Sequence, residues 1–228
     1  MDRSQVEKDL QNLLDIKTYP CIAAVQAWKR KELLFDLYSG FGTGVSARAL
    51  ASQLVDFKKQ QTPRNFFLTY MAVFPEDVSQ DEEEFEAGLW RELSAMWEHR
   101  DIAGEWDPRF SANPDDKNFC FSLDGSAFFV VGLHPRSSRQ ARRLPYNALV
   151  FNLYDQFIEL RRKGLFDSMA KTIRERDIQL QGSVNPMVET YTNTWESIQY
   201  SGRNNSPDWR CPFHKEKRDE KVPPDFQI

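Results

Sequence analysis

Apolar side chains recur at three- and four-residue spacing in several stretches of the chain, which is the pattern of helices with one buried face. The spacing predicts helices over about 2–15, 46–60, 79–99 and 154–176, the last interrupted at Gly164. Ser46 and Ser79 stand at the starts of two of them, where a hydroxyl can cap the first turn. The acidic residues that follow Ser79 suit the positive end of a helix dipole.

Other stretches are continuously apolar and rich in residues that favour strands. The nine residues 66–74 and the run 147–153 predict buried strands, and the segment 33–44 is expected to hold a short strand followed by a glycine-rich turn. Two strand-like arms flank Asp124 and Gly125, a pair of residues typical of a tight hairpin turn. The combination predicts an α+β fold: a single domain with a mainly antiparallel sheet and packed helices.

No internal repeat or linker divides the chain, so we expect one domain over residues 1–214. The charged segment 215–228 contains few large apolar residues, and we expect it to be a disordered tail.

The composition, 40% hydrophobic and 28% charged residues, is that of a globular protein. A net charge of -4 argues against a nucleic-acid partner. The charged N-terminal segment resembles neither a signal peptide nor a membrane span, and the expected location is the cytoplasm. Three widely spaced cysteines argue against a disulfide framework and against a structural zinc site.

Common catalytic motifs are absent from the sequence. The glycine-rich run at 39–44 lacks the lysine and the glycine spacing of a phosphate-binding loop. There is also no GxSxG or HExxH motif, so nothing specific supports a hydrolase.

The densest cluster of candidate binding residues follows the predicted hairpin. His134 comes directly after a strand, and Arg136, Arg139, Arg142 and Arg143 follow within nine residues. Guanidinium groups bind carboxylates and phosphates through paired charge-assisted hydrogen bonds, which favours an anion site. The alternative is a solvated basic loop that forms only surface ion pairs.

Two residues are candidates for ligands of a haem iron. His134 is either such a ligand or a surface or capping histidine. Cys211, next to a proline, is either a thiolate ligand or a buried apolar residue beside Trp209 and Phe213.

Several of these segments together closely resemble the YqcI/YcgG family over about residues 19–214. The resemblance rests on these runs: YPC at 19–21, WDP at 106–108, AFFVVGLHPRSSRQARR at 127–143, ALVFNLYDQF at 148–157, TIRERDIQLQGSVNPM at 172–187, QYSGR at 199–203 and WRCPF at 209–213. The family often has histidine where this chain has Tyr154, so a role for that histidine does not carry over.

Members of this family with an assigned activity are haem-dependent N-hydroxylases of guanidino compounds. The resemblance therefore implies haem b, a guanidino or related amine substrate and an electron donor, with no nucleic-acid or membrane partner. It makes His134 the preferred axial ligand, with Cys211 as the alternative.

The remaining expected roles follow from the same resemblance. Arg136, Arg139, Arg142 and Arg143 become candidate partners of the haem propionates. Gln181 and Asn185 are expected on the pocket wall.

A cationic substrate needs an acidic side chain facing it. Asp107 and Asp155 are the carboxylates expected there. Two other functions remain open: a haem-binding sensor or carrier without turnover, and a haem-free module that binds an anionic partner. The sequence leaves the oligomeric state open.

Overall fold

The computed structural model describes residues 1–185, 196–206 and 208–213. At its centre is a five-stranded sheet with the order β1-β2-β5-β4-β3. The strands are β1 (Leu33–Leu37), β2 (Thr69–Phe74), β3 (Ser122–Leu123), β4 (Ser126–Leu133) and β5 (Asn147–Leu153). β1 runs parallel to β2 and every other pairing is antiparallel, which confirms the predicted α+β fold with a mainly antiparallel sheet.

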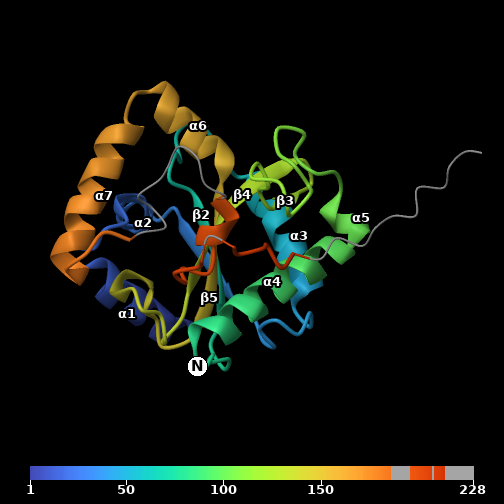
Figure 1. Cartoon of the computed structure of the whole chain (residues 1–228), viewed down its shortest axis with the longest axis horizontal. Helices are drawn as coiled ribbons and strands as arrows, with labels where there is room; N and C mark the ends of the chain where they lie inside the picture. Colours follow the sequence, from blue (N-terminus) through green and yellow to red (C-terminus); the bar gives the residue numbers. More distant parts are fainter. Residues whose placement is uncertain (186–195, 207, 214–228) are drawn as a thin grey trace, which may run out of the picture.

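Helices cover both faces of this sheet, as Figure 1 shows. One layer consists of α3 (Ala47–Lys58), α4 (Glu82–Glu98) and α5 (Arg100–Ala103). The other layer consists of α1 (Arg3–Leu14), α2 (Ile22–Lys29), α6 (Tyr154–Arg162) and α7 (Phe166–Gln181). Two short 3-10 helices, η1 (Gln140–Arg142) and η2 (Glu196–Gln199), lie in the connections that follow β4 and α7.

Alternation of side chains along the strands separates the core into two parts. Tyr70, Ala72 and Phe74 of β2 pack with α3 and α4 in a large, aromatic-rich cluster. Met71 and Val73, one position out of step, pack on the other face with α1. The two faces of one strand therefore belong to two different environments.

Most predicted elements are confirmed within a few residues. α4 begins later than predicted, because Asp81 rather than Ser79 caps it by accepting a hydrogen bond from the Glu84 backbone N–H. Asn147 binds Ser79 instead, through hydrogen bonds to its hydroxyl and backbone N–H. The hairpin turn is confirmed, with positive φ at both Asp124 and Gly125.

Other elements differ from the prediction. The strand expected over 66–74 begins only at Thr69. The interruption predicted at Gly164 is confirmed, since α6 ends before it and α7 begins after it, but α7 extends beyond the predicted end to Gln181. α2 was not predicted, since the YPC run and the mixed composition of 22–29 carry no clear periodicity. The tail predicted over 215–228 lies outside the described residues. None of the helices described is both long enough and apolar enough to cross a membrane.

Candidate functional site

A cavity of about 270 Å³ lies between the sheet and the layer formed by α1, α2, α6 and α7. Its floor is the face of the sheet opposite α4, with Met71, Val131 and Val150 among the lining side chains. Its walls are largely apolar, and it is partly open to solvent. The volume lies near the lower end of the range for small-molecule sites, roughly 300 to 1,000 Å³.

Several apolar residues of helix α7 face this cavity instead of packing against other side chains. Only Ala170 and Asp177 of the helix are buried. Phe166, Met169 and Ile173 line the cavity and are only half-buried. An apolar helix face that meets an open space rather than side chains is suited to contact a ligand.

Cationic groups outnumber anionic ones on the described cavity wall. The arginines that line it are Arg139, Arg142, Arg161 and Arg174, and the carboxylates are Asp177 and Glu196. Arginine is the side chain best suited to hold carboxylates in partly buried sites. This cavity therefore favours a ligand that carries negative charge.

One of these arginines already has a partner. Arg139 Nη2 lies 2.6 Å from Asp177 Oδ2, and both side chains are buried. The same guanidinium donates to the hydroxyl and the carbonyl oxygen of Ser183. Asp177 also accepts a hydrogen bond from the Asn185 backbone N–H, at 2.6 Å. The pair fastens α7 to η1 at one end of the cavity.

Arg142 has no such partner. Its Nη1 donates to the carbonyl oxygen of Tyr200 at 3.1 Å, and none of the described carboxylates forms an ion pair with it. Gly202, at φ +83°, leaves room for the side chain, because a Cβ there would lie 2.5 Å from Arg142 Cδ. Burial lowers the pKa of Arg142 to about 10, so the group is still a cation at neutral pH.

Glu196 and Tyr154 form a second polar group on the wall. The Tyr154 hydroxyl donates to Glu196 Oε1 at 2.8 Å. Burial raises the pKa of Glu196, and it raises that of Tyr154 to about 12, with Glu196 adding to the shift. Glu196 forms no ion pair among the described residues, although Arg161 and the hydrogen bond from Tyr154 both act to lower its pKa against the larger effect of burial. A further cationic group would stabilise this largely desolvated carboxylate.

The structure brings some predicted site residues to this cavity and leaves others outside it. Arg139, Arg142 and Asn185 line it. Arg136 and Arg143 are exposed, as the basic-loop alternative predicted for them, and Arg143 Nε donates to the Ser137 carbonyl oxygen. Gln181 bridges to the arginine loop: it accepts from the Gln140 backbone N–H and donates to the Ser138 carbonyl oxygen.

His134 lies on the other side of the sheet from the cavity. Val131 and Leu133 of β4 face the cavity, whereas Gly132 faces Phe85 of α4. His134 follows the same alternation and stacks on Phe85, with ring centroids 4.2 Å apart. It is 0% exposed, and neither ring nitrogen has a hydrogen-bond partner. Its expected role as axial ligand stays untested, but its position does not serve this cavity.

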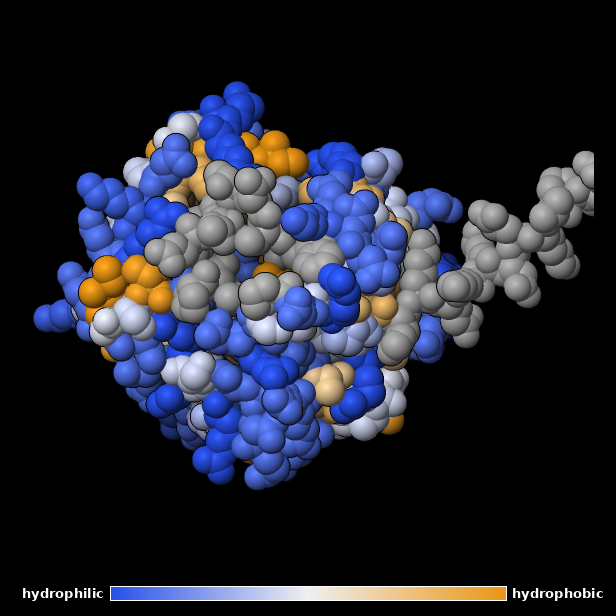
Figure 2. Space-filling view, in the orientation of Figure 1, coloured by the Kyte–Doolittle hydropathy of each residue, from blue (hydrophilic) through white to orange (hydrophobic). Residues whose placement is uncertain are grey.

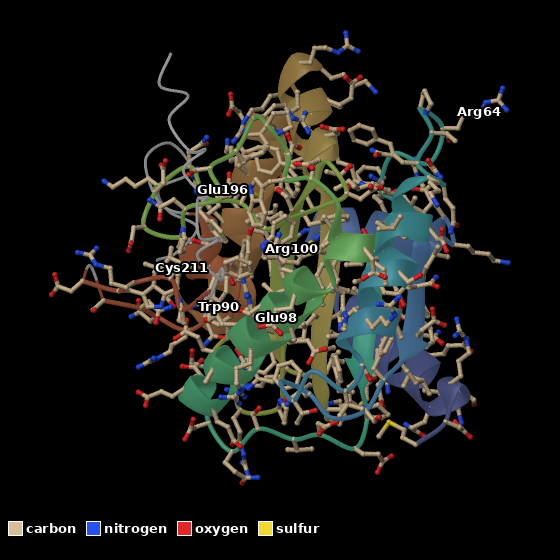
Figure 3. The ribbon with its side chains drawn as sticks, turned by 90° about the vertical axis from the view of Figure 1, so that its right-hand side faces the viewer. Arg64, Trp90, Glu98, Arg100, Glu196 and Cys211 are labelled. Atoms are coloured by element: carbon tan, nitrogen blue, oxygen red, sulfur yellow. The ribbon has the colours of Figure 1, made fainter. Side chains whose placement is uncertain are left out.

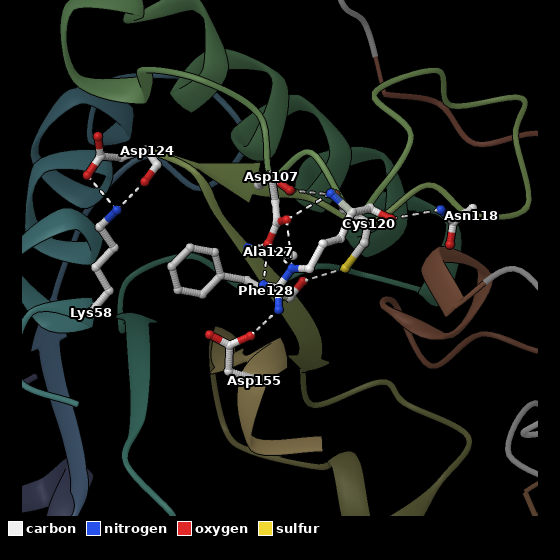
Figure 4. Close-up of polar contacts among 10 residues, drawn as sticks. Lys58, Asp107, Asn118, Cys120, Asp124, Ala127, Phe128 and Asp155 are labelled. Atoms are coloured by element: carbon white, nitrogen blue, oxygen red, sulfur yellow. Dashed lines mark hydrogen bonds and ion pairs between the residues drawn. The ribbon is translucent and has the colours of Figure 1, made fainter. Parts of the chain in front are cut away.

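Asp107 and Asp155 are also placed elsewhere, in a cluster centred on Arg109 (Figure 4). Arg109 Nη2 lies 2.6 Å from Asp107 and Nη1 lies 2.5 Å from Asp155. Asp107 also accepts from the Ala127 backbone N–H. Burial works to raise the pKa of Asp107, but the bonds from Arg109 outweigh it and lower the pKa. Neither carboxylate lines the cavity, and both form ion pairs with Arg109.

Cys211 lies in the aromatic cluster on the α4 side, close to Trp90 as Figure 3 shows. It is 8% exposed, and burial raises the pKa of its thiol to about 12. This environment is the one predicted by the alternative in which Cys211 is a buried apolar residue. The same figure labels Glu196, which belongs to the cavity wall.

Sequence reasoning missed several residues of the cavity, and two of the polar ones are Cys21 and Glu196. Cys21 lines it from the N-terminus of α2, and Glu196 lines it from η2. The available signal for Cys21 was its place in the YPC run, which belongs to the resemblance and ends where α2 begins. Glu196 had no signal, because only tertiary folding brings it beside Tyr154. In the described part of the chain, no three His, Cys, Asp or Glu side chains cluster as a metal site would need.

The fold and this cavity define an α+β protein in which a helix-flanked sheet borders a largely apolar cavity. The chain belongs to the YqcI/YcgG family, whose sequence profile matches residues 10–214. It is similar to "Uncharacterized protein YqcI" of Bacillus subtilis (strain 168), at 26% identity over 209 residues, covering 87% of this chain and 82% of that protein. No solved structure matches the chain.

Proposed function

We propose that the chain binds haem b in the cavity above the sheet and N-hydroxylates a guanidino amino acid or a related amine. The observation that carries the proposal is the combination of apolar walls with an excess of arginine over carboxylate side chains. A haem has the same combination of properties, since its macrocycle is apolar and its two propionates are anionic. The resemblance to haem-dependent N-hydroxylases points to the same ligand.

The residues of the cavity suit this group. Met71, Val131 and Val150 would form an apolar floor for one face of the macrocycle, and Phe166 and Met169 of α7 would contact the other. A haem is larger than the enclosed space of about 270 Å³, so part of it would lie in the open part of the cavity.

The arginines of the wall supply partners for the propionates. Arg139 and Arg142 both line the cavity; Arg139 already holds Asp177, whereas Arg142 forms no ion pair with a described carboxylate. Charge-assisted bonds to guanidinium groups offset the cost of burying a carboxylate. The predicted propionate role therefore fits Arg142 best, and the exposed Arg136 and Arg143 least.

When bound, haem supplies the activation of dioxygen. In the overall reaction an N–H bond of the substrate becomes N–OH, and the second oxygen atom leaves as water. Two electrons from an external reductant and two protons complete the balance. The chain's own contribution is to exclude bulk water and to orient the nitrogen that reacts.

Glu196 is the residue proposed to hold a cationic substrate. It is the described lining carboxylate that is not paired with an arginine, and Tyr154 fixes its orientation through the 2.8 Å hydrogen bond. A guanidinium group would form two parallel hydrogen bonds with a carboxylate. Glu196 thus takes the role that the sequence suggested for Asp107 and Asp155.

Turnover tests the proposal directly. Haem-supplied protein is incubated with L-arginine, dioxygen and a chemical reductant, and the products are analysed by mass spectrometry. The expected product is heavier than arginine by one oxygen atom, and omission of either dioxygen or reductant abolishes it. A haem-loaded protein that gives no product from arginine or other amines would instead be a sensor or carrier. A protein that takes up no haem would contradict the proposal.

A further inference from the structure

The segment 196–206 lies along the outer edge of β4 and joins the cavity side of the sheet to the α4 side. β3 pairs with only the first two residues of β4, and farther along this edge the Gly132 backbone N–H donates to the Tyr200 carbonyl oxygen at 2.7 Å. The Tyr200 ring contacts Phe129 of the cavity wall, with centroids 5.7 Å apart, and stacks on Trp90 of α4 at 5.6 Å. This tyrosine therefore marks the point where the segment passes from one face of the sheet to the other.

The two ends of the segment have different surroundings. Glu196 and Gln199 of η2 line the cavity. The side chains of Ser201, Arg203 and Asn205 do not line it, and each of them donates a hydrogen bond to a carboxylate of α4. One end of the segment thus contributes to the site, and the other end is attached to the opposite layer of helices.

Glu86 of α4 is the attachment point. Its Oε1 accepts from the Ser201 hydroxyl at 2.9 Å and from Asn205 Nδ2 at 2.7 Å, and its Oε2 accepts from Arg203 Nη1 at 3.1 Å. Glu86 is 5% exposed. A buried carboxylate with three donors is held firmly, because moving any one of them leaves part of its charge without a partner.

One of these donors extends the attachment to the turn that carries Glu196. Asn205 Nδ2, bonded to Glu86, also donates to the carbonyl oxygen of Ile198 at 3.4 Å. Ile198 belongs to η2 and lies two residues after Glu196. At the cavity end, the 2.8 Å hydrogen bond from Tyr154 sets the direction of the Glu196 carboxylate. The backbone position of Glu196 is therefore fixed from the α4 side, and its carboxylate is oriented from the cavity side.

We infer that Glu86 is a positioning residue for substrate binding: through Asn205 and η2 it holds Glu196 where that carboxylate meets a guanidinium group. The inference rests on the proposed function. Glu86 does not line the cavity, so it acts only through the segment that it holds. A bidentate pair between a carboxylate and a guanidinium group depends on both positions and angles, and a shift of about 1 Å is enough to weaken it.

A double-mutant cycle on ligand affinity tests this role. Titration calorimetry measures binding of L-arginine and of the uncharged analogue L-citrulline to haem-loaded wild type, Glu86→Gln, Glu196→Gln and the double variant. Glu86→Gln keeps the size of the side chain but puts an amide against the Arg203 guanidinium. We expect it to bind L-arginine roughly threefold or more weakly and L-citrulline as wild type does. In the Glu196→Gln background the same change should have no further effect, because the charge that it positions is gone.

The matched control is Glu83→Gln. Glu83 pairs with the same Arg203 from the same helix, but its side chain is 74% exposed and it bonds to neither of the other two donors. All affinities should stay at the wild-type values in this variant. If Glu86→Gln does not fold, Asn205→Leu takes its place in the cycle, since it removes the link to Ile198 and leaves the pair of Glu86 with Arg203.

The possible outcomes separate the inference from the proposed function. An unchanged affinity for L-arginine, an equal loss for both ligands, or an equal loss with and without the Glu196 charge would show that Glu86 has only a structural role, and would overturn the inference alone. Equal L-arginine affinity of wild type and Glu196→Gln would overturn the substrate role of Glu196 and the inference with it. A haem-loaded wild-type protein that binds neither ligand would overturn the proposed substrate class itself.

Discussion

At the scale of single residues, burial decides how the ionisable groups behave. His134 has two ring nitrogens without hydrogen-bond partners, and burial lowers its pKa to about 4, although Glu82 opposes the shift. Glu196 shows the converse, since burial raises the pKa of its carboxyl group. Burial disfavours the charged form of both groups, but only Glu196 lies where a cationic ligand could offset this cost.

His134 should make the protein less stable in acid. The unfolded chain binds a proton at this residue below about pH 6.5, whereas the folded chain binds it only below about pH 4. The folded state therefore loses stability as the pH falls from 6.5 to 4, by about 3 kcal/mol at most. His134→Phe should preserve the stacking on Phe85 and abolish this loss, measured by urea unfolding across that pH range. The control is His99→Phe, at a half-buried position. An unchanged pH dependence in His134→Phe would show that the residue is accessible to protons when folded.

Glu196→Gln should weaken binding of a cationic substrate selectively. The variant keeps the size of the side chain and an acceptor for Tyr154 but removes the negative charge. We expect L-arginine to bind haem-loaded variant at least about tenfold more weakly, the loss typical of a charged hydrogen bond. L-Citrulline, the uncharged analogue, should bind both proteins alike. Titration calorimetry measures the two affinities, and an equal loss for both ligands would refute the role of the charge.

At the scale of elements, α7 is held above the cavity by polar contacts more than by a packed core. α7 has two buried residues, whereas α4 has ten. The Arg139–Asp177 ion pair and the bonds of Gln181 fasten its C-terminal half to the arginine loop. Figure 2 shows apolar side chains at the surface over α6 and α7, and the exposed Ile158, Leu165 and Ile178 belong to this part of the chain.

Removing one partner of the buried ion pair should loosen α7. Asp177→Asn leaves the Arg139 guanidinium buried without a counter-charge, which costs about 3 kcal/mol or more. Urea unfolding measures the loss. The double variant Arg139→Met, Asp177→Leu should recover much of it, because it removes both charges. A single variant as stable as the wild-type protein would mean that solvent already screens the pair.

Elements were more predictable than the site, and the strand next to the arginine loop shows why. A continuous apolar run predicted β5 with its observed bounds, and the hairpin signal at Asp124 and Gly125 predicted the place of β4, because strands buried on both faces are continuously apolar. The same continuity conceals which residue faces which layer. A step of one residue, from Leu133 to His134, moves a side chain from the cavity to α4. Arg139 and Arg142 of the predicted arginine loop line the cavity, but only the folded chain separates them from Arg136 and Arg143.

At the scale of the whole molecule, the sheet separates a rigid half from a half that is open for a ligand. The α4 side is filled by an aromatic cluster, and the α7 side contains the cavity. A ligand that fills this cavity stabilises the fold by mass action. Hemin should therefore slow hydrogen exchange in 166–181 more than in the already packed 82–98. Equal protection of both helices would place the ligand elsewhere.

The central claim is that this cavity holds haem, and a hemin titration of the purified apo-protein tests it most directly. Val150→Trp puts an indole into the cavity, whereas Val45→Trp makes the same change at a site that is 75% exposed. The account predicts a saturable Soret band at about one haem per chain for wild type and Val45→Trp, and binding at least roughly tenfold weaker for Val150→Trp. Equal haem binding by all three proteins, or no Soret band in the wild-type protein, would contradict it.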